Sequence, residues 1–115
     1  MRTAIIILAA ALALAACSGG GSGYDVTYQV GGSGGAQTAS MTFFNANGDT
    51  TQQGDQPLPW SFSMAGVGSV AYVDISAQNG QGSGTVDCSI SVDGQHVASN
   101  TAVGGYQICD VHATV

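Results

Sequence analysis

Two histidines, His96 and His112, are the side chains best suited to proton transfer or metal binding in this chain of 115 residues. A catalytic serine needs an activating base within reach, and no Gly-x-Ser-x-Gly turn marks an activated serine here. Imidazole and carboxylate groups together suit zinc, and Asp93 and Asp110 lie near the histidines in the sequence. Their spacing matches no metal motif, so we expect no catalytic residue, no bound metal and no cofactor.

Cys17 follows a segment that is typical of a secretion signal. After Arg2, residues 3–16 form an apolar run that ends Leu-Ala-Ala-Cys, which is similar to a bacterial lipobox, where the cysteine sulfur receives a diacylglycerol group. We therefore expect residues 1–16 to be a lipoprotein signal peptide, and Cys17 to hold the protein on the extracytoplasmic face of the cell membrane. A transmembrane helix is the alternative, but a span needs about 20 apolar residues, and this run has 14.

The two remaining cysteines, Cys88 and Cys109, form an even pair in a chain that is expected to be exported. Disulfides persist in oxidising compartments, so these two residues are predicted to be joined. The bridge would close a loop of about 20 residues, worth about 3 kcal/mol in the chain-entropy model. A metal or redox site is the alternative, and the absence of a Cys-x-x-Cys motif and of companion ligands in the sequence disfavours it.

The charge of the chain excludes several classes of partner. Arg2 is the single Lys or Arg residue against seven aspartates, which gives a formal net charge of −6. Removal of residues 1–16 would leave 99 residues with a formal side-chain charge of −7. Nucleic-acid binding needs Lys or Arg to neutralise phosphates, so no nucleic acid is expected as a partner. Attachment to the membrane must then come from acyl chains on Cys17 rather than from charge.

The elements that position these residues are predicted to be strands. Residues 17–23 are dominated by Gly and Ser, which indicates a flexible tether. Beyond the tether, alternating apolar and polar residues predict short strands at about 24–30, 38–45, 50–56, 60–64, 70–78, 85–92, 95–100 and 106–111. Turn signals such as Asn47-Gly48 and Asp93-Gly94 separate several of them. We expect one domain, residues 24–115, folded as an all-β, immunoglobulin-like antiparallel sandwich of about seven or eight strands with one disulfide.

The same alternation indicates which aromatic side chains face the interior. Trp60 is the sole tryptophan and is expected to anchor the core, although it could instead line an apolar groove for a lipidic ligand. Phe43 and Phe44 are adjacent, so they point to opposite faces of a strand and one of them should be exposed. Tyr72 lies on the face opposite to Val73 and could join the exposed ring. The predicted binding surface therefore comprises Phe43, Phe44, Trp60 and Tyr72.

Three segments of the chain together resemble the MmpS family. They are Val26-Thr27-Tyr28-Gln29-Val30, Leu58-Pro59-Trp60-Ser61-Phe62, and Cys88-Ser89-Ile90-Ser91-Val92-Asp93-Gly94 followed by Cys109. Members of this family are small actinobacterial membrane proteins that accompany MmpL transporters, of the RND superfamily, in exporting lipids and siderophores. The resemblance covers residues 24–109 and implies an extracytoplasmic β-sandwich of immunoglobulin-like type. Typical members have an N-terminal transmembrane helix, whereas this chain carries the expected lipoprotein signal.

The resemblance and the expected anchor together imply a role in transport. We expect a non-enzymatic, lipid-anchored accessory or adaptor protein for an RND-type exporter of lipids or siderophores. A second hypothesis is a free-standing lipoprotein that binds an apolar envelope ligand between its sheets, in a cavity lined by Trp60, Phe62 and Tyr28. A third is a passive role in the cell envelope, without a dedicated ligand.

Overall fold

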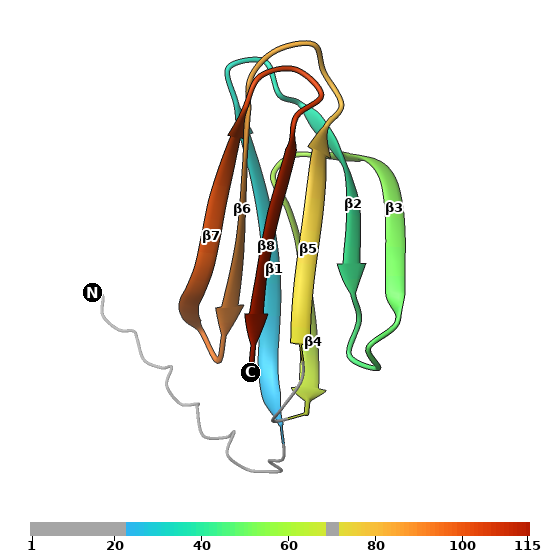
Figure 1. Ribbon diagram of the computed structural model, residues 1–115, viewed down its shortest axis with the longest axis vertical. Helices are drawn as coiled ribbons and strands as arrows, with labels where there is room; N and C mark the ends of the chain where they lie inside the picture. The colour runs from blue at the N-terminus through green and yellow to red at the C-terminus, as the bar shows by residue number, and fades with distance from the viewer. Residues whose placement is uncertain (1–22, 69–71) are drawn as a thin grey trace, which may run out of the picture.

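The computed structural model describes residues 23–68 and 72–115, and these residues form eight strands in two antiparallel sheets (Figure 1). The first sheet has the order β4-β1-β6-β7 and the second has the order β3-β2-β5-β8. The strands are β1 (Tyr24–Ser33), β2 (Thr38–Phe44), β3 (Thr50–Pro57), β4 (Trp60–Val67), β5 (Tyr72–Asn79), β6 (Thr85–Val92), β7 (Gln95–Val103) and β8 (Ile108–Thr114). The prediction of an all-β, immunoglobulin-like sandwich is confirmed. The expected signal peptide, Cys17 and all of the tether except Gly23 lie outside the described residues.

The core of the sandwich consists of side chains from alternate positions of both sheets. In β1, β2 and β5 every second side chain is buried and the side chains between them face outward, because successive side chains of a strand point to opposite faces. The largest fully buried apolar side chains are Tyr28, Phe43, Met41, Ile75, Ile90, Val26, Val30, Val67, Val73 and Val86. Full burial of one such side chain contributes about 1.5–3 kcal/mol, so this core is the main source of stability. β3, which is polar on both faces, lies at an edge of its sheet as predicted.

A disulfide between Cys88 and Cys109 joins the two sheets, which confirms the predicted pairing. Cys88 lies on β6 of the first sheet and Cys109 on β8 of the second, and both residues are buried. Because β8 is an edge strand with β5 as its ladder partner, the bridge is a second and independent attachment of this strand to the domain.

The turns follow the sequence signals, while several strand boundaries differ from the prediction. Asp93 and Gly94 have φ angles of 51° and 82°, the positive values that a type I′ hairpin turn requires. The last strand begins at Ile108 rather than at Tyr106, because Tyr106 has a φ of 59° and belongs to the β7–β8 loop. The strand expected from residue 70 is described from Tyr72 onward, since 69–71 lie outside the described residues.

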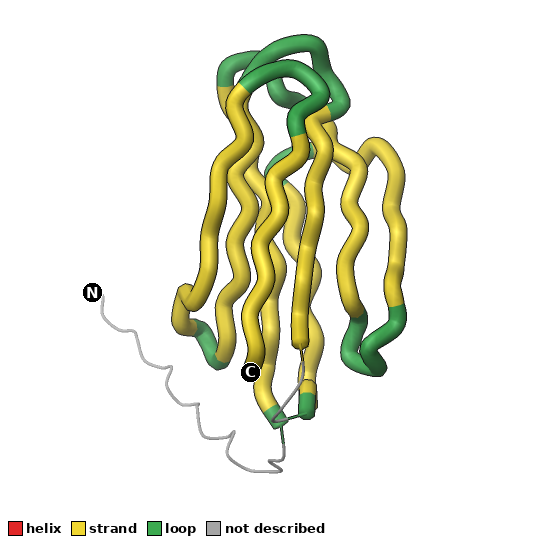
Figure 2. Tube along the Cα trace, viewed as in Figure 1, coloured by secondary structure: helices red, strands yellow, loops and turns green. Residues whose placement is uncertain are grey.

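The strands run along the long axis of the sandwich, so the loops gather at its two ends (Figure 2). β1 begins and β8 ends at one of these, together with the β2–β3 and β6–β7 hairpins (Figure 1). We call this the proximal end. The β1–β2, β5–β6 and β7–β8 loops lie at the opposite, distal end. Within the described part of the chain, no helix has the length and apolar character needed to cross a bilayer.

Candidate functional site

The outer face of the second sheet brings together most of the chemically versatile side chains of the domain. On β5 and β8 the inward positions are mostly taken by buried apolar residues, together with Cys109 and Asn79, so the alternate positions face outward. These outward positions carry Tyr72 and Asp74 on β5 and Asp110 and His112 on β8. β5 and β8 are neighbours in the sheet, and Asp74 is directly opposite His112 in the register. Residues about 36 positions apart in the sequence therefore share one surface.

An aromatic row crosses this surface from β2 to β8 and consists of Phe44, Tyr72 and His112. The ring centroids of Phe44 and Tyr72 lie 5.7 Å apart in an edge-to-face arrangement, and those of Tyr72 and His112 lie 5.6 Å apart. Both separations fall in the range of favourable aromatic contacts. Tyr72 is 46% exposed, so the row offers apolar surface to a partner.

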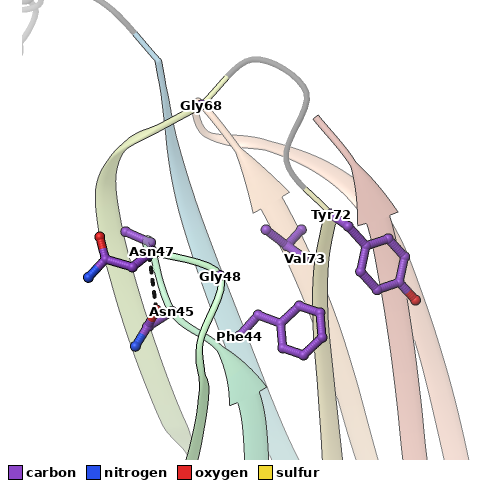
Figure 3. A pocket seen from close by; sticks show the side chains of 8 residues that line it. Phe44, Asn45, Asn47, Gly48, Gly68, Tyr72 and Val73 are labelled. Atoms are coloured by element: carbon purple, nitrogen blue, oxygen red, sulfur yellow. Dashed lines mark hydrogen bonds between the residues drawn. The ribbon is translucent and has the colours of Figure 1, made fainter.

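The aromatic row borders a hollow where β2 and β5 separate. Their ladder ends at the pair Phe43 and Ile75, and the Tyr28 hydroxyl donates a 2.7 Å hydrogen bond to the carbonyl oxygen of Phe44 just beyond it. Burial raises the pKa of Tyr28 to about 12, so this hydroxyl remains a donor at neutral pH. The hollow has a volume of about 490 Å³ and is lined by Phe44, Asn45, Ala46, Asn47, Gly48, Gly68, Tyr72 and Val73 (Figure 3).

Beside the aromatic row lies a carboxylate–histidine cluster made of Asp74, Asp110 and His112. The oxygen and nitrogen atoms that these three side chains offer lie within 4.8 Å of one another. Two neighbours hold the carboxylates in place: the Ser76 hydroxyl donates to Asp110 Oδ1 at 2.7 Å, and the Tyr72 hydroxyl donates to Asp74 Oδ2 at 3.3 Å. Asp74 Oδ1 is buried and has no hydrogen-bond partner among the described residues.

The two carboxyl groups of the cluster titrate as a linked pair. Partial burial and the neighbouring Asp110 carboxylate raise the pKa of Asp74 to about 6. The close approach of the Asp74 carboxyl and the hydrogen bond from Ser76 hold the pKa of Asp110 below its usual value. The physical reason is that two carboxylates this close repel each other when both are ionised, so the proton is taken up first by the more buried Asp74. No Lys or Arg follows Arg2 in the sequence, so no fixed side-chain cation can compensate the pair.

The structure corrects the predicted binding surface at Phe43. This residue is 1% exposed and lies in an aromatic cluster, with ring centroids 5.5 Å from Tyr28, 5.4 Å from Trp60 and 4.7 Å from Phe62. Phe44 is the half-buried member of the pair, and it contacts Tyr72 as expected. The ring of Phe43 also fills the space among the three side chains that would have lined a ligand cavity between the sheets.

Trp60 does not join Phe44 and Tyr72, because it lies on β4 of the first sheet. It is half-buried against the core, and its indole N–H donates to Gln53 Oε1 at 3.2 Å, which satisfies its polar group. Trp60 thus packs against the core, as a core anchor would. A smaller hollow of about 430 Å³ beside it has a mixed polar and apolar lining, made of Gln29, Val30, Gly31, Pro59, Trp60, Ser61, Asp87 and Ser89.

The structure separates most of the residues that sequence proximity suggested as companions of His112. His96 and Asp93 belong to the β6–β7 hairpin of the first sheet, and within the described residues neither belongs to the carboxylate–histidine cluster. Asp110 does lie beside His112, and Asp74, which the sequence did not suggest, completes the cluster. The outward alternation of Asp74 and Asp110 was visible in the sequence, whereas the pairing of β5 with β8 was not.

Comparison with known proteins identifies the family of this chain. Residues 22–114 match the family described as Mycobacterium membrane protein. A search of curated proteins finds no match. The family match covers all eight described strands and agrees with the three segments that resemble MmpS proteins. The chain therefore belongs to the Mycobacterium membrane protein family, which is of the MmpS type.

Proposed function

We propose that this protein is a non-enzymatic accessory subunit of an RND-type exporter of lipids or siderophores, held on the extracytoplasmic face of the membrane by acyl chains on Cys17. The family match over residues 22–114 carries the proposal, because MmpS-type proteins are membrane proteins that accompany such exporters. The tether would keep the domain close to the permease, which raises its effective concentration there.

The placement of the chain ends supports this arrangement. The strand that follows the tether starts at the proximal end of the sandwich (Figure 1). An anchor at Cys17 would therefore attach the domain by its proximal end. The distal loops would then point away from the lipid, toward the extracytoplasmic part of a partner.

The distal end carries exposed apolar side chains that suit such a partner. Val103 is 75% exposed at the end of β7, Tyr106 is 60% exposed in the following loop, and Ile108 is 59% exposed at the start of β8. We call these three residues the distal apolar tip. Clusters of exposed apolar residues mark interaction surfaces more often than isolated ones do. The acidic charge of the domain favours a partner whose surrounding surface is rich in Lys and Arg.

A copurification experiment tests the exporter role. The protein is recovered from its native membrane in mild detergent, and the proteins bound to it are identified by mass spectrometry. Val103→Asp and Ile108→Asp should each reduce recovery of a large multi-span permease by about tenfold, since a buried charge costs several kcal/mol. Val97→Asp is the matched control, because Val97 is also exposed on β7 but lies near the proximal end. Recovery of no permease by the wild-type protein would refute the proposal.

The anchor is tested separately by mass spectrometry of the native N-terminus. A chain that begins at Cys17 and carries acyl groups supports the lipoprotein form. Retention of Met1 with an unmodified Cys17 would refute the anchor and leave the exporter role to be judged by copurification alone.

A further inference from the structure

The carboxylate–histidine cluster combines features that point to a cation ligand. Asp74, Asp110 and His112 come from two neighbouring strands, with one nitrogen and two carboxylate oxygens within 4.8 Å of one another. Within residues 23–68 and 72–115, Asp74 Oδ1 is buried without a hydrogen-bond partner, which is costly for a carboxylate oxygen. The chain offers no Lys or Arg after Arg2 that could neutralise the two carboxylates. A cation bound by these three side chains would satisfy the buried oxygen and offset the charge of the two carboxylates.

We propose that Asp74, Asp110 and His112 form a binding site for one divalent transition-metal ion of the zinc class. One imidazole nitrogen and two carboxylate oxygens make a mixed ligand set that zinc accepts, with three protein ligands and one open position. Magnesium and calcium prefer oxygen ligands alone and need six or more of them, so they fit the cluster less well. This proposal replaces the expectation from the sequence that no metal is bound.

The surroundings of the cluster are suited to holding these ligands. Ser76 and Tyr72 each donate to one oxygen of a carboxylate, which orients Asp110 and Asp74 while leaving a second oxygen of each free. In a tetrahedral zinc site with bonds of about 2.0–2.2 Å, two ligand atoms lie about 3.3–3.6 Å apart, so the cluster must contract on binding. The exposed side chains of Asp110 and His112 can do so by rotation.

A metal at this position would link β5 to β8 across the outer face of the second sheet. Cys109 on β8 already joins the inner face to the first sheet through the disulfide. The edge strand would then be fixed from both sides. The open coordination position faces solvent beside the aromatic row, where water or a donor atom from a partner can occupy it.

The test is zinc binding by the protein purified in mild detergent without a histidine tag and stripped of metal by a chelator. Calorimetric titration with zinc chloride should give one ion per chain, and zinc should raise the thermal midpoint. His112→Ala, Asp110→Asn and Asp74→Asn should each weaken binding at least about tenfold. His96→Ala and Asp93→Asn are the matched controls, since they change the same residue types on the first sheet and should bind zinc as the wild type does.

A second measurement covers variants that fold poorly. In the wild-type protein, zinc should shift the NMR signals of the His112 imidazole and leave those of His96 unchanged. The proposal is overturned if the wild type takes up no zinc at micromolar concentration, or if His112 shows no shift. It is also overturned if magnesium or calcium binds as tightly as zinc, or if the control variants weaken binding as much as the cluster variants do.

Discussion

Removal of the disulfide by Cys88→Ala together with Cys109→Ala is the most direct test of how this small domain is stabilised. The bridge joins residues 21 positions apart and ties the edge strand β8 to the opposite sheet. In the chain-entropy model, a loop of this length restricts the unfolded chain by about 3 kcal/mol. The lost sulfur atoms also leave unfilled space in the core, because both residues are buried.

The expected loss is a large share of the stability of a domain of this size, which is typically about 5–15 kcal/mol. For such domains 1 kcal/mol corresponds to about 4–8 °C in Tm, so the double variant should melt roughly 12–24 °C below the wild type. Trp60 is the sole tryptophan and packs half-buried against the core, so its fluorescence reports unfolding in urea or on heating.

The wild-type protein treated with a reductant is the control for this experiment, because it loses the bridge but keeps both sulfur atoms. It should lose most of the same stability. If the free energy of unfolding falls by less than about 1 kcal/mol in both samples, the bridge does not act by constraining the unfolded chain, and the reasoning is refuted.

Three single substitutions test three features of the domain: the hydrogen bond from Tyr28 to β2, the packing of the distal loops, and the titration of Asp74. Tyr28→Phe removes the buried donor to a β2 carbonyl oxygen and should lower the free energy of unfolding in urea by about 1–3 kcal/mol; an unchanged midpoint would contradict this. Gly105→Ala places a methyl group against the backbone of Gly82 and should cost about 1–3 kcal/mol, measured by thermal unfolding, whereas Gly54→Ala enters open space and should not. The raised pKa of Asp74, about 6, means that its proton stabilises the fold below pH 4 and that this contribution is lost as the pH rises through 6. With a chelator present, Asp74→Asn should therefore gain stability relative to the wild type between pH 4.5 and pH 7.5, and an equal difference at both values would show that Asp74 does not titrate in this range.

The sequence alone was enough to predict the fold class, because its signals are local or covalent. Alternation with a period of two marks the strands, and the residues at Asp93-Gly94 suit a turn with two positive φ angles. The polar segment from 50 to 56 could not be central in a sheet, and it is an edge strand. The pairing of Cys88 with Cys109 followed from the number of cysteines and the expected compartment.

The candidate site depended on contacts between strands that are distant in the sequence. Period-two alternation showed that Phe43 and Phe44 face opposite sides, but the packing of the first sheet over β2 decided that Phe43 is the buried one. Likewise, the sequence could not show that β5 lies beside β8, since more than 25 residues and two other strands separate them in the chain. Strand order is set by the burial of the whole core, and this alone brings Asp74 next to His112.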